Sequence, residues 1–123
     1  DEKFTPVISP LANDIGSDNG LNVNADLAAA AIAGGLKAQS LIVLTDVSGI
    51  YRNYPDPTSI ITEISATELA MMKNDFQGGM APKVAACLSA IAAGAIAVRI
   101  IDGNSAESLL LALAGNGGTL VHA

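Results

Sequence analysis

The sequence predicts an α/β fold, with a mostly parallel sheet sandwiched by helices on both faces. Short apolar runs rich in β-branched residues alternate with helix-forming runs along the chain, the order expected of repeated strand–helix units. Half of the 123 residues are hydrophobic but only 3% are aromatic, so alanine, leucine, isoleucine and valine have to build the interior. Since no linker, repeat or low-complexity tract divides the chain, one domain over residues 1–123 is expected.

The N-terminal part predicts two strands, a tight turn and a helix. PVIS (6–9) is apolar and predicts a buried strand, and LNVN (21–24) alternates apolar with polar residues, as a short strand does. DNG (18–20) supplies the turn, because an Asn-Gly pair tolerates the positive φ that a tight hairpin needs. An alanine-rich run then predicts a helix from about residue 25 to residue 37.

The middle of the chain predicts a strand followed by an irregular excursion. LIVLT (41–45) is continuously apolar, which is typical of a central parallel strand buried on both faces. DVSG (46–49) ends this strand. YRNYPDPTS (51–59) contains two prolines and predicts a surface loop or a β-ribbon, and IITEI (60–64) predicts a short edge strand.

The second half predicts three helices and two strands. SATE (65–68) matches the S-x-x-E capping box and begins a helix that runs to about Lys73. A flexible loop, QGGM (77–80), leads to Pro82, which suits the first turn of the next helix. That helix aligns four apolar residues on one face, namely Val84, Cys87, Leu88 and Ile91. The remaining elements are a strand over 97–102, a helix over 105–114 and a closing strand in GTLVHA (118–123).

The charge balance excludes whole classes of partner. A net charge of −6 with six basic residues argues against nucleic acid, which needs a basic surface, and few aromatics argue against base stacking on single strands. No apolar run reaches the roughly 18 residues of a membrane span, so no membrane partner is expected. Cys87, the single cysteine, lies in an apolar helical run and predicts a buried thiol in a reducing compartment, the cytoplasm. His122 has no predicted role, and no metal-binding side chain is assigned.

A polar cluster is predicted where the first helix begins. Asn22 and Asn24 alternate along a short strand, so both side chains point to one face, and Asp26 follows in the first helical turn. Asn24 or Asp26 could simply cap the helix, since a helix N-terminus favours an amide acceptor and a negative charge. Only one cap is needed, so the three side chains together favour a polar ligand at this junction.

A second candidate segment follows the strand over 41–45. Its residues are Thr45, Asp46, Val47, Ser48, Gly49, Ile50 and Tyr51. They stand at the carboxyl end of a strand, where open α/β sheets bind their ligands. Their spacing alone favours an ordinary turn, in which Asp46 bonds its own backbone and Gly49 supplies a positive φ.

A third candidate segment, GGMAPK (78–83), joins paired glycines to a lysine at a helix start. Gly78 and Gly79 let backbone amides approach a ligand, while Lys83 lies off the apolar face of the helix. A lysine in the first turn opposes the helix dipole, and a bound phosphate resolves this conflict by accepting both the amides and the ammonium group. A solvated surface lysine is the alternative. Neither a Walker A nor a Rossmann glycine motif occurs.

NVNAD (22–26), LTDVSGIY (44–51) and GGMAPK (78–83), in this order, resemble motifs of the amino acid kinase family. Within the family, the resemblance is to members that phosphorylate the side-chain carboxylate of N-acetylglutamate with ATP in arginine biosynthesis. It covers essentially the whole chain but only about half of such an enzyme. It implies that residues 1–123 are the C-terminal, ATP-binding half and that the N-terminal half, which carries substrate and dimer contacts, is absent from these residues.

The resemblance implies a role for each motif. Lys83 and Asp26 become catalytic residues: Lys83 neutralises charge on the transferred phosphoryl group, and Asp26 orients the catalytic lysines. Asn22 and Asn24 become substrate-binding residues. The implied nucleotide-binding residues are those from Thr45 to Tyr51 together with Asp75, Phe76, Gln77, Gly79 and Met80. ATP would bring Mg²⁺ with it, bound mainly through the nucleotide's phosphates.

The partial match has consequences for activity and leaves alternatives open. With half of the phosphate clamp outside residues 1–123, the chain alone is expected to be a poor kinase or none. An exposed sheet edge or apolar face could drive the formation of a homo-oligomer. A related kinase acting on acetylaminoadipate and a non-catalytic nucleotide-binding or interaction module are the alternative functions.

Overall fold

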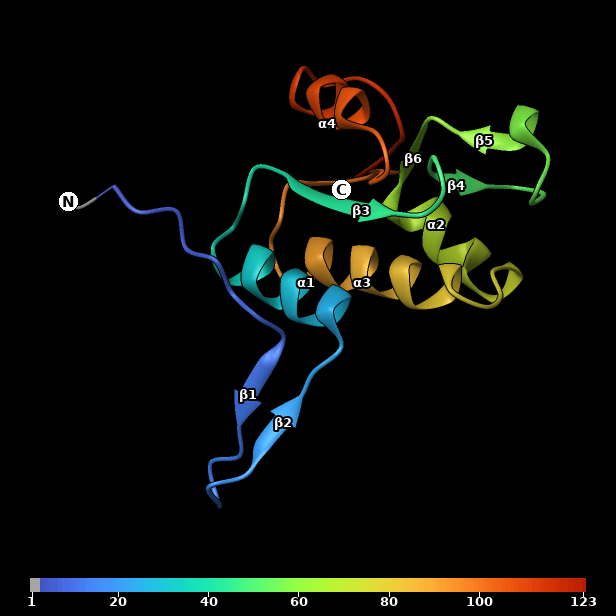
Figure 1. Cartoon of the computed structure of the whole chain (residues 1–123). Coiled ribbons are helices and arrows are strands. Elements are labelled where there is room, and N and C mark those ends of the chain that lie inside the picture. Colours follow the sequence, from blue (N-terminus) through green and yellow to red (C-terminus); the bar gives the residue numbers. More distant parts are fainter. Residues whose placement is uncertain (1–2) are drawn as a thin grey trace.

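A four-stranded sheet organises the chain in the computed structural model, which describes residues 3–123 (Figure 1). In sheet order the strands are β3 (Leu41–Thr45), β7 (Ala97–Asp102), β8 (Thr119–His122) and β6 (Glu63–Ser65). β3 and β7 are parallel, β8 and β6 are parallel, and β7 and β8 are antiparallel. The predicted α/β class is therefore confirmed, and the sheet is mostly parallel.

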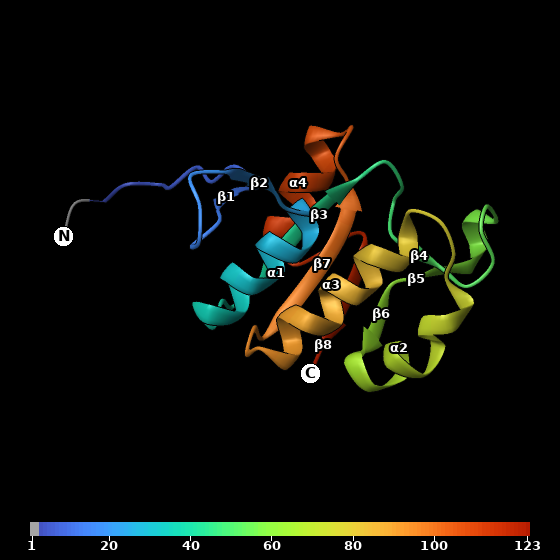
Figure 2. The ribbon, with the colours of Figure 1, turned by 90° about the horizontal axis from the view of Figure 1, so that it is seen from below.

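Helices cover both faces of this sheet. α1 (Ala25–Gly35) and α3 (Met80–Ala92) lie side by side on one face, and α4 (Ala106–Leu113) lies on the other (Figures 1 and 2). α2 (Ala66–Met72) follows β6 and packs beside α3. Two short 3₁₀ helices, Pro57–Ser59 and Lys73–Asp75, complete the helical elements of the described residues. Among residues 3–123, no helix combines the length and the apolar content needed to cross a membrane.

Two small antiparallel pairs stand outside the main sheet. β1 (Leu11–Asn13) and β2 (Gly20–Asn22) form an exposed hairpin that projects from the body of the molecule (Figure 1). β4 (Ile50–Tyr51) and β5 (Ile60–Ile61) pair with each other and form the base of a ribbon over residues 50–61. Of the two predicted alternatives for residues 51–59, a surface loop or a β-ribbon, the structure forms the ribbon.

The prediction of a buried strand at residues 6–9 is wrong. These residues form no strand, and Val7 is 97% exposed. Pro6 and Pro10 flank the segment and lack backbone N–H donors, and no element packs over its apolar side chains. β2 also ends at Asn22, two residues earlier than predicted, because Asn24 already has the conformation of a helix cap.

The prediction that residues 41–45 form the central strand is also wrong. Within residues 3–123, β3 pairs only with β7 and so lies at a sheet edge, where Leu44 is 51% exposed. β7 takes the central place, with Val98, Ile100 and Ile101 at most 1% exposed. The error arises because an apolar run indicates that a strand is hydrophobic but does not indicate how many strands pair with it.

The helix boundaries predicted from local sequence signals agree with the observed boundaries to within two residues. Ser65 Oγ accepts from the backbone N–H of Glu68, whose carboxylate accepts from the backbone of Ser65, so the predicted capping box is present. Pro82 lies in the first turn of α3 as predicted. The single strand predicted over residues 60–64 divides into β5 and β6, which belong to different sheets.

Arg99 is a buried cation that the sequence did not reveal. It lies in β7, between apolar neighbours, and is only 8% exposed. Its guanidinium donates to the carbonyl of Gly115, at 2.8 Å, and to that of Gly117. Both glycines have a positive φ, so a turn of the chain between α4 and β8 presents these carbonyls to the sheet.

The core lies between the sheet and the paired helices α1 and α3, and Cys87 is part of it. The Cys87 side chain is 0% exposed, so the predicted buried thiol is confirmed. Burial raises the pKa of the Cys87 thiol to about 12, and the negative charge of Asp26 acts in the same direction. The group therefore stays protonated and unreactive in the folded protein.

Cys87 should consequently resist alkylation in the native state. Near pH 8, iodoacetamide is expected to leave the folded protein unmodified and to alkylate the thiol once urea unfolds the chain, because only the unfolded thiol ionises readily. Mass spectrometry of the two samples measures this difference. Alkylation of the folded protein at the rate of the unfolded chain would contradict the buried position.

Candidate active site

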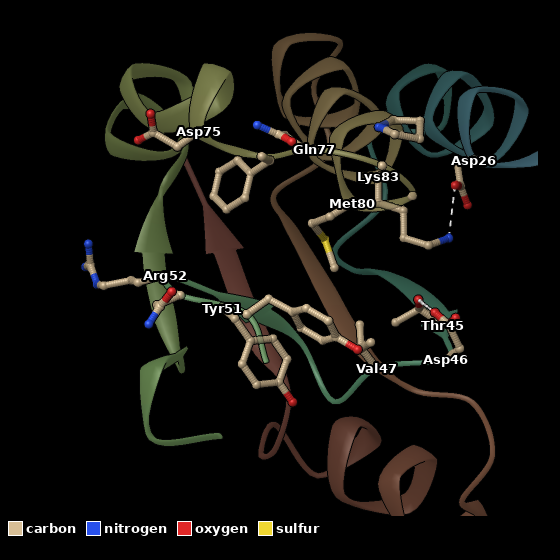
Figure 3. Close-up of a pocket in the computed structure, with 16 residues that line it drawn as sticks. Asp26, Thr45, Asp46, Val47, Tyr51, Arg52, Asp75, Gln77, Met80 and Lys83 are labelled. Atoms are coloured by element: carbon tan, nitrogen blue, oxygen red, sulfur yellow. Dashed lines mark hydrogen bonds and ion pairs between the residues drawn. The ribbon is translucent and has the colours of Figure 1, made fainter. Parts of the chain in front are cut away.

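A pocket of about 980 Å³ opens where β3 ends, between the start of α3 and the ribbon over residues 50–61 (Figure 3). It combines charged, aromatic and glycine residues from segments that are far apart in the sequence. Its lining consists of Asp26, Thr45, Asp46, Val47, Tyr51, Arg52, Asn53, Tyr54, Asp75, Phe76, Gln77, Gly78, Gly79, Met80, Pro82 and Lys83. Eleven of the predicted site residues are among them.

An ion pair between two helix starts forms one side of the pocket. Lys83 Nζ lies 3.1 Å from Asp26 Oδ2, and the two side chains are 20% and 23% exposed. Asp26 belongs to the first turn of α1 and Lys83 to the first turn of α3. The two residues are 57 positions apart, so only the packing of α1 against α3 brings them together.

The cap of α1 is Asn24, which leaves Asp26 free for this pair. Asn24 Oδ1 accepts from the backbone N–H of Leu27 at 3.0 Å. The sequence left open whether Asn24 or Asp26 caps the helix, and the structure assigns the cap to Asn24. Asn22 stands on the exposed hairpin, and neither asparagine lines the pocket. Their predicted contact with a substrate stays a prediction.

The turn after β3 supplies the next part of the lining. Thr45 Oγ1 donates to Asp46 Oδ1 at 3.0 Å, and the Thr45 carbonyl accepts from the backbone N–H of Gly103 at 2.7 Å. Asp46, Val47 and Tyr51 line the pocket, whereas Ser48, Gly49 and Ile50 do not.

Gly49 and Ile50 are instead packed beneath the site. Ile50 is 0% exposed, and a Cβ on Gly49 would lie 2.6 Å from the Thr119 hydroxyl. These two positions fix how the ribbon leaves the sheet, and so they position Tyr51 at the pocket.

The start of α3 presents free backbone to the pocket. Its cap residue, Gly79, has no side chain to accept from the first-turn N–H groups. A Cβ on Gly78 or Gly79 would meet no atom within 4 Å, and Gly78 has a φ of +58°. Paired glycines thus leave room for a ligand beside N–H groups that point out of a helix N-terminus.

The two cations of the pocket lie at opposite sides. In Figure 3, Arg52 and Asp75 lie across the pocket from Lys83, Asp26 and Asp46, with Met80 and Tyr51 between them. The Arg52 guanidinium also contacts Met72, with Nη1 3.7 Å from Sδ. The lining therefore holds three carboxylates and two cations around a partly apolar middle.

Five lining residues were not among the predicted site residues: Arg52, Asn53, Tyr54, Gly78 and Pro82. Gly78 and Pro82 belong to the GGMAPK segment and could have been taken from it. Arg52, Asn53 and Tyr54 lie in the stretch predicted only as a loop or ribbon. No local signal shows that this ribbon folds back over the end of β3.

The geometry suits an anion with an extended, partly apolar body. Amides and an ammonium group at one side can hold phosphate oxygens, and the aromatic and thioether groups farther along can contact a flat ring. The described residues contain no group of three or more His, Cys, Asp or Glu side chains placed to hold a metal ion.

Known proteins resemble the chain in sequence. The model of the amino acid kinase family matches residues 1–102. The acetylglutamate kinase of Arthrobacter sp. (strain FB24) is 47% identical over 111 residues, which are 86% of this chain and 36% of that protein. The acetylglutamate kinase of Pseudarthrobacter chlorophenolicus is 52% identical over 91 residues, which are 74% of this chain and 28% of that protein.

Solved structures resemble the chain in fold. The N-acetylglutamate synthase of Neisseria gonorrhoeae, complexed with coenzyme A and L-arginine, matches with a TM-score of 0.82 and 26% identity, over 94% of this chain and 27% of that chain. The carbamate kinase of Giardia lamblia bound to AMP-PNP matches with a TM-score of 0.74 and 27% identity, over 91% of this chain and 40% of that chain. The chain thus spans well under half the length of the relatives that it matches.

Proposed function

The chain belongs to the amino acid kinase family, and we propose from this premise that it is the ATP-binding part of an enzyme that phosphorylates N-acetyl-L-glutamate. The reaction would transfer the γ-phosphoryl group of ATP to the side-chain carboxylate and leave ADP and an acyl phosphate. The observation that carries the proposal is the Lys83–Asp26 pair beside the free N-terminus of α3. Acetylglutamate kinases are also the sequence relatives described above.

Lys83 is the proposed charge-neutralising group. Phosphoryl transfer is catalysed mainly by positioning and by electrostatic stabilisation of the equatorial oxygens, so a fixed ammonium group is the chemistry required. Asp26 holds the ammonium in place at 3.1 Å, which restricts a long and otherwise mobile side chain. Amides at Gly78 and Gly79 lie close enough to the same pocket to bind phosphate oxygens as well.

The residues present fit a nucleotide that carries Mg²⁺ on its phosphates. The glycines leave open space at the helix start, and Asp46 faces the same side of the pocket as Lys83 (Figure 3). When bound with the nucleotide, the metal ion would supply positive charge against the phosphate oxygens. Lys83 and the amides orient these oxygens, and the turn over Thr45–Val47 borders the cavity on the β3 side.

No general base is needed for this acceptor. The carboxylate of a glutamate side chain is ionised near neutral pH, so it is already a nucleophile. Asn22 and Asn24 remain the proposed substrate contacts, at the hairpin and helix start beside Asp26. We keep the cytoplasm as the proposed location, in line with a small-molecule biosynthetic reaction.

The complete reaction is proposed for the longer protein, because the chain spans 28–36% of the two kinases compared above. On its own, the chain is proposed to bind the nucleotide and to transfer little or no phosphate. Acetylaminoadipate is the alternative acceptor, because it differs from acetylglutamate by one methylene group. Assays of the longer protein with both acceptors would separate them.

Removal of the Lys83 charge tests the proposal directly. Lys83→Met is expected to weaken the binding of ADP with Mg²⁺ about 10- to 100-fold, because it removes a charge-assisted hydrogen bond to phosphate. Isothermal titration calorimetry of the chain measures this loss. Lys37→Met is the matched control, since Lys37 lies beyond the end of α1 and outside the pocket.

Two results would overturn the proposal. One is a folded wild-type chain that binds no ADP with Mg²⁺. The other is a Lys83→Met chain that binds it as tightly as the Lys37→Met control. Circular dichroism spectra of all three chains establish that the fold is kept.

A further inference from the structure

We propose that the free edge of β3 is an interaction surface for residues 4–9 of a second copy of this chain. Each copy inserts this segment, here called the arm, beside β3 of the other copy, so that two chains form a symmetric dimer by exchanging arms. The proposed nucleotide site is not involved, since Thr45 is the one residue of β3 that lines the pocket and no arm residue does so.

The two edges of the main sheet differ in how well they are protected. β6, at one edge, has three residues, and Glu63 places a charge on it. β3, at the other edge, has five residues and contains no charge, proline or glycine. Short strands, charges and prolines are the usual means by which proteins keep a sheet edge from pairing with another chain. The β3 edge has none of these protections, so it is open to a further strand.

The backbone of β3 has hydrogen-bonding groups that face the free edge. The Thr45 carbonyl accepts from the N–H of Gly103, just after β7, so Thr45 directs its backbone groups toward β7. Because these directions alternate along a strand, Ile42 and Leu44 direct theirs toward the free edge. The Leu44 side chain is also 51% exposed, since α4 packs mainly on β7. A strand at this edge would therefore gain both ladder hydrogen bonds and apolar contact.

The arm has the exposure of a strand that lacks a neighbour. Figures 1 and 2 show the chain before β1 extending away from the body of the molecule. Its apolar side chains Phe4, Val7 and Ile8 are 79%, 97% and 61% exposed. Apolar side chains left in water favour a contact that buries them. The arm thus has a reason to pair that its own chain does not satisfy in this structure.

Two prolines restrict the arm to one neighbouring strand. Pro6 and Pro10 lack an N–H donor and are four positions apart, so in an extended segment both direct their backbone groups to the same side. Val7 and Ser9 direct theirs to the other side, where no donor is missing. The arm can therefore pair on one side and is blocked on the other, as suits the outermost strand of a sheet.

The order of elements predicts the orientation of the pair. The arm, α1 and β3 follow one another as strand, helix and strand, and such units place their two strands parallel in one sheet. A parallel register with Val7 opposite Val43 directs the N–H and C=O groups of Val7 to Ile42 and Leu44. Ile8 then lies opposite Leu44, and its side chain covers the exposed leucine on the same face.

A second copy satisfies the arm and the edge together. The arm stands away from the sheet of its own chain, whereas exchange gives every arm an edge and every edge an arm. Each dimer contains the contact twice, because the symmetry of the pair repeats it. The exchange of an identical element between two copies is a low-cost way to form a dimer. The chain is therefore expected to be a dimer held by two arms.

Sedimentation velocity over a range of concentrations tests the exchange. The chain should sediment as a dimer, at twice its mass of 12.4 kDa, and should dissociate on dilution. Val7→Asp should raise the dissociation constant of the dimer about 100-fold or more, because each dimer carries the change twice. Ile15→Asp is the matched control, since Ile15 is also fully exposed but stands in the turn between β1 and β2.

A mixing experiment distinguishes exchange between chains from closure of the arm on its own chain. Leu44→Lys gives the β3 edge a charge of the kind that protects natural edge strands, and this variant alone should be monomeric. A mixture of Val7→Asp and Leu44→Lys chains should form dimers again, weaker than those of the wild type. In such a dimer, the intact arm of the Leu44→Lys chain pairs with the intact edge of the Val7→Asp chain.

Three results would overturn the proposal. One is a wild-type chain that stays monomeric at every concentration tested. Another is a Val7→Asp chain that associates as tightly as the Ile15→Asp control, which would mean that the arm takes no part. The third is a mixture of the two variants that stays monomeric. Circular dichroism spectra establish that each variant keeps the fold, so that a loss of association reports on the contact itself.

Discussion

Replacing Gly34 with alanine is expected to lower the free energy of unfolding by about 2 kcal/mol or more, the effect of overpacking a closely packed contact. Gly34 is buried in α1, where the helix meets the end of α3. A Cβ at this position would lie 2.3 Å from the Cβ of Ala93 and 3.3 Å from two backbone atoms of the same residue. The Cβ and the backbone of Ala93 cannot move aside as the end of a flexible side chain can, so the two helices themselves would have to separate.

Gly35 provides a control one position along the same helix. A Cβ on Gly35 would meet no atom within 4 Å, and alanine is the better helix former, so Gly35→Ala should leave stability unchanged or slightly raised. Urea unfolding followed by circular dichroism compares the two variants. Equal midpoints for Gly34→Ala and Gly35→Ala would refute the close contact.

The Gly34 variant should also disturb the proposed nucleotide binding, although Gly34 does not line the pocket. α1 and α3 run side by side (Figure 2), and their contacts include Gly34 against Ala93 near their ends and Asp26 with Lys83 near their starts. Separation of the helices at one contact alters their packing at the other. The distance between Asp26 and Lys83 thus depends on a glycine about two helical turns away.

Replacing Thr119 with valine is expected to lower the free energy of unfolding by about 3 kcal/mol. The Thr119 hydroxyl accepts from the backbone N–H of Ile50 at 2.8 Å and donates to the carbonyl of Ile61. Thr119 is 0% exposed, so valine keeps the shape but leaves these backbone groups without the hydroxyl that pairs them. Each such buried group costs about 1–3 kcal/mol.

Thr119→Ser distinguishes the contribution of the hydroxyl to stability from that of the methyl group. Serine keeps both hydrogen bonds and loses one methyl contact, for which about 1 kcal/mol is expected. Chemical unfolding of the two variants gives the comparison. A Thr119→Val protein as stable as Thr119→Ser would show that the hydroxyl does not hold β4 and β5 to the sheet. Because the ribbon carries the pocket residues Tyr51 and Tyr54, the proposed nucleotide binding should fall together with stability.

The features predicted correctly from the sequence are those encoded by neighbouring residues. The capping box needs only Ser65 and Glu68, three positions apart, and Pro82 needs only its own ring to favour a first turn. The fold class likewise follows from the local alternation of strand and helix patterns. The order of the strands does not follow from local patterns. β3 has a more continuous apolar sequence than β7, yet β7 lies inside the sheet and β3 at its edge. A strand's place in the sheet depends on which other strands pair with it on each side.

The same distinction explains which of the pocket-lining residues were predicted from the sequence. Lys83 and Gly79 belong to a short segment in which glycines precede a lysine at a helix start, and this pattern can be recognised in the sequence. Asp26 directly follows the cap of a helix, which can be recognised in the same way. Tyr54 was missed because its place at the pocket depends on Thr119, which joins the ribbon to the sheet across 69 positions of the sequence. Local patterns carry no information about such a distant contact.

The charges that line the pocket have a consequence for how a ligand arrives. Two cations stand against three carboxylates, and the whole chain carries −6, so the field of the molecule repels an anion at long range. Attraction begins only within about 8 Å, the screening distance at physiological salt, where Lys83 and the helix amides act at close quarters. We therefore expect an anionic ligand to gain nothing from long-range electrostatic steering toward this chain, so that its affinity depends more on its dissociation rate than on its association rate.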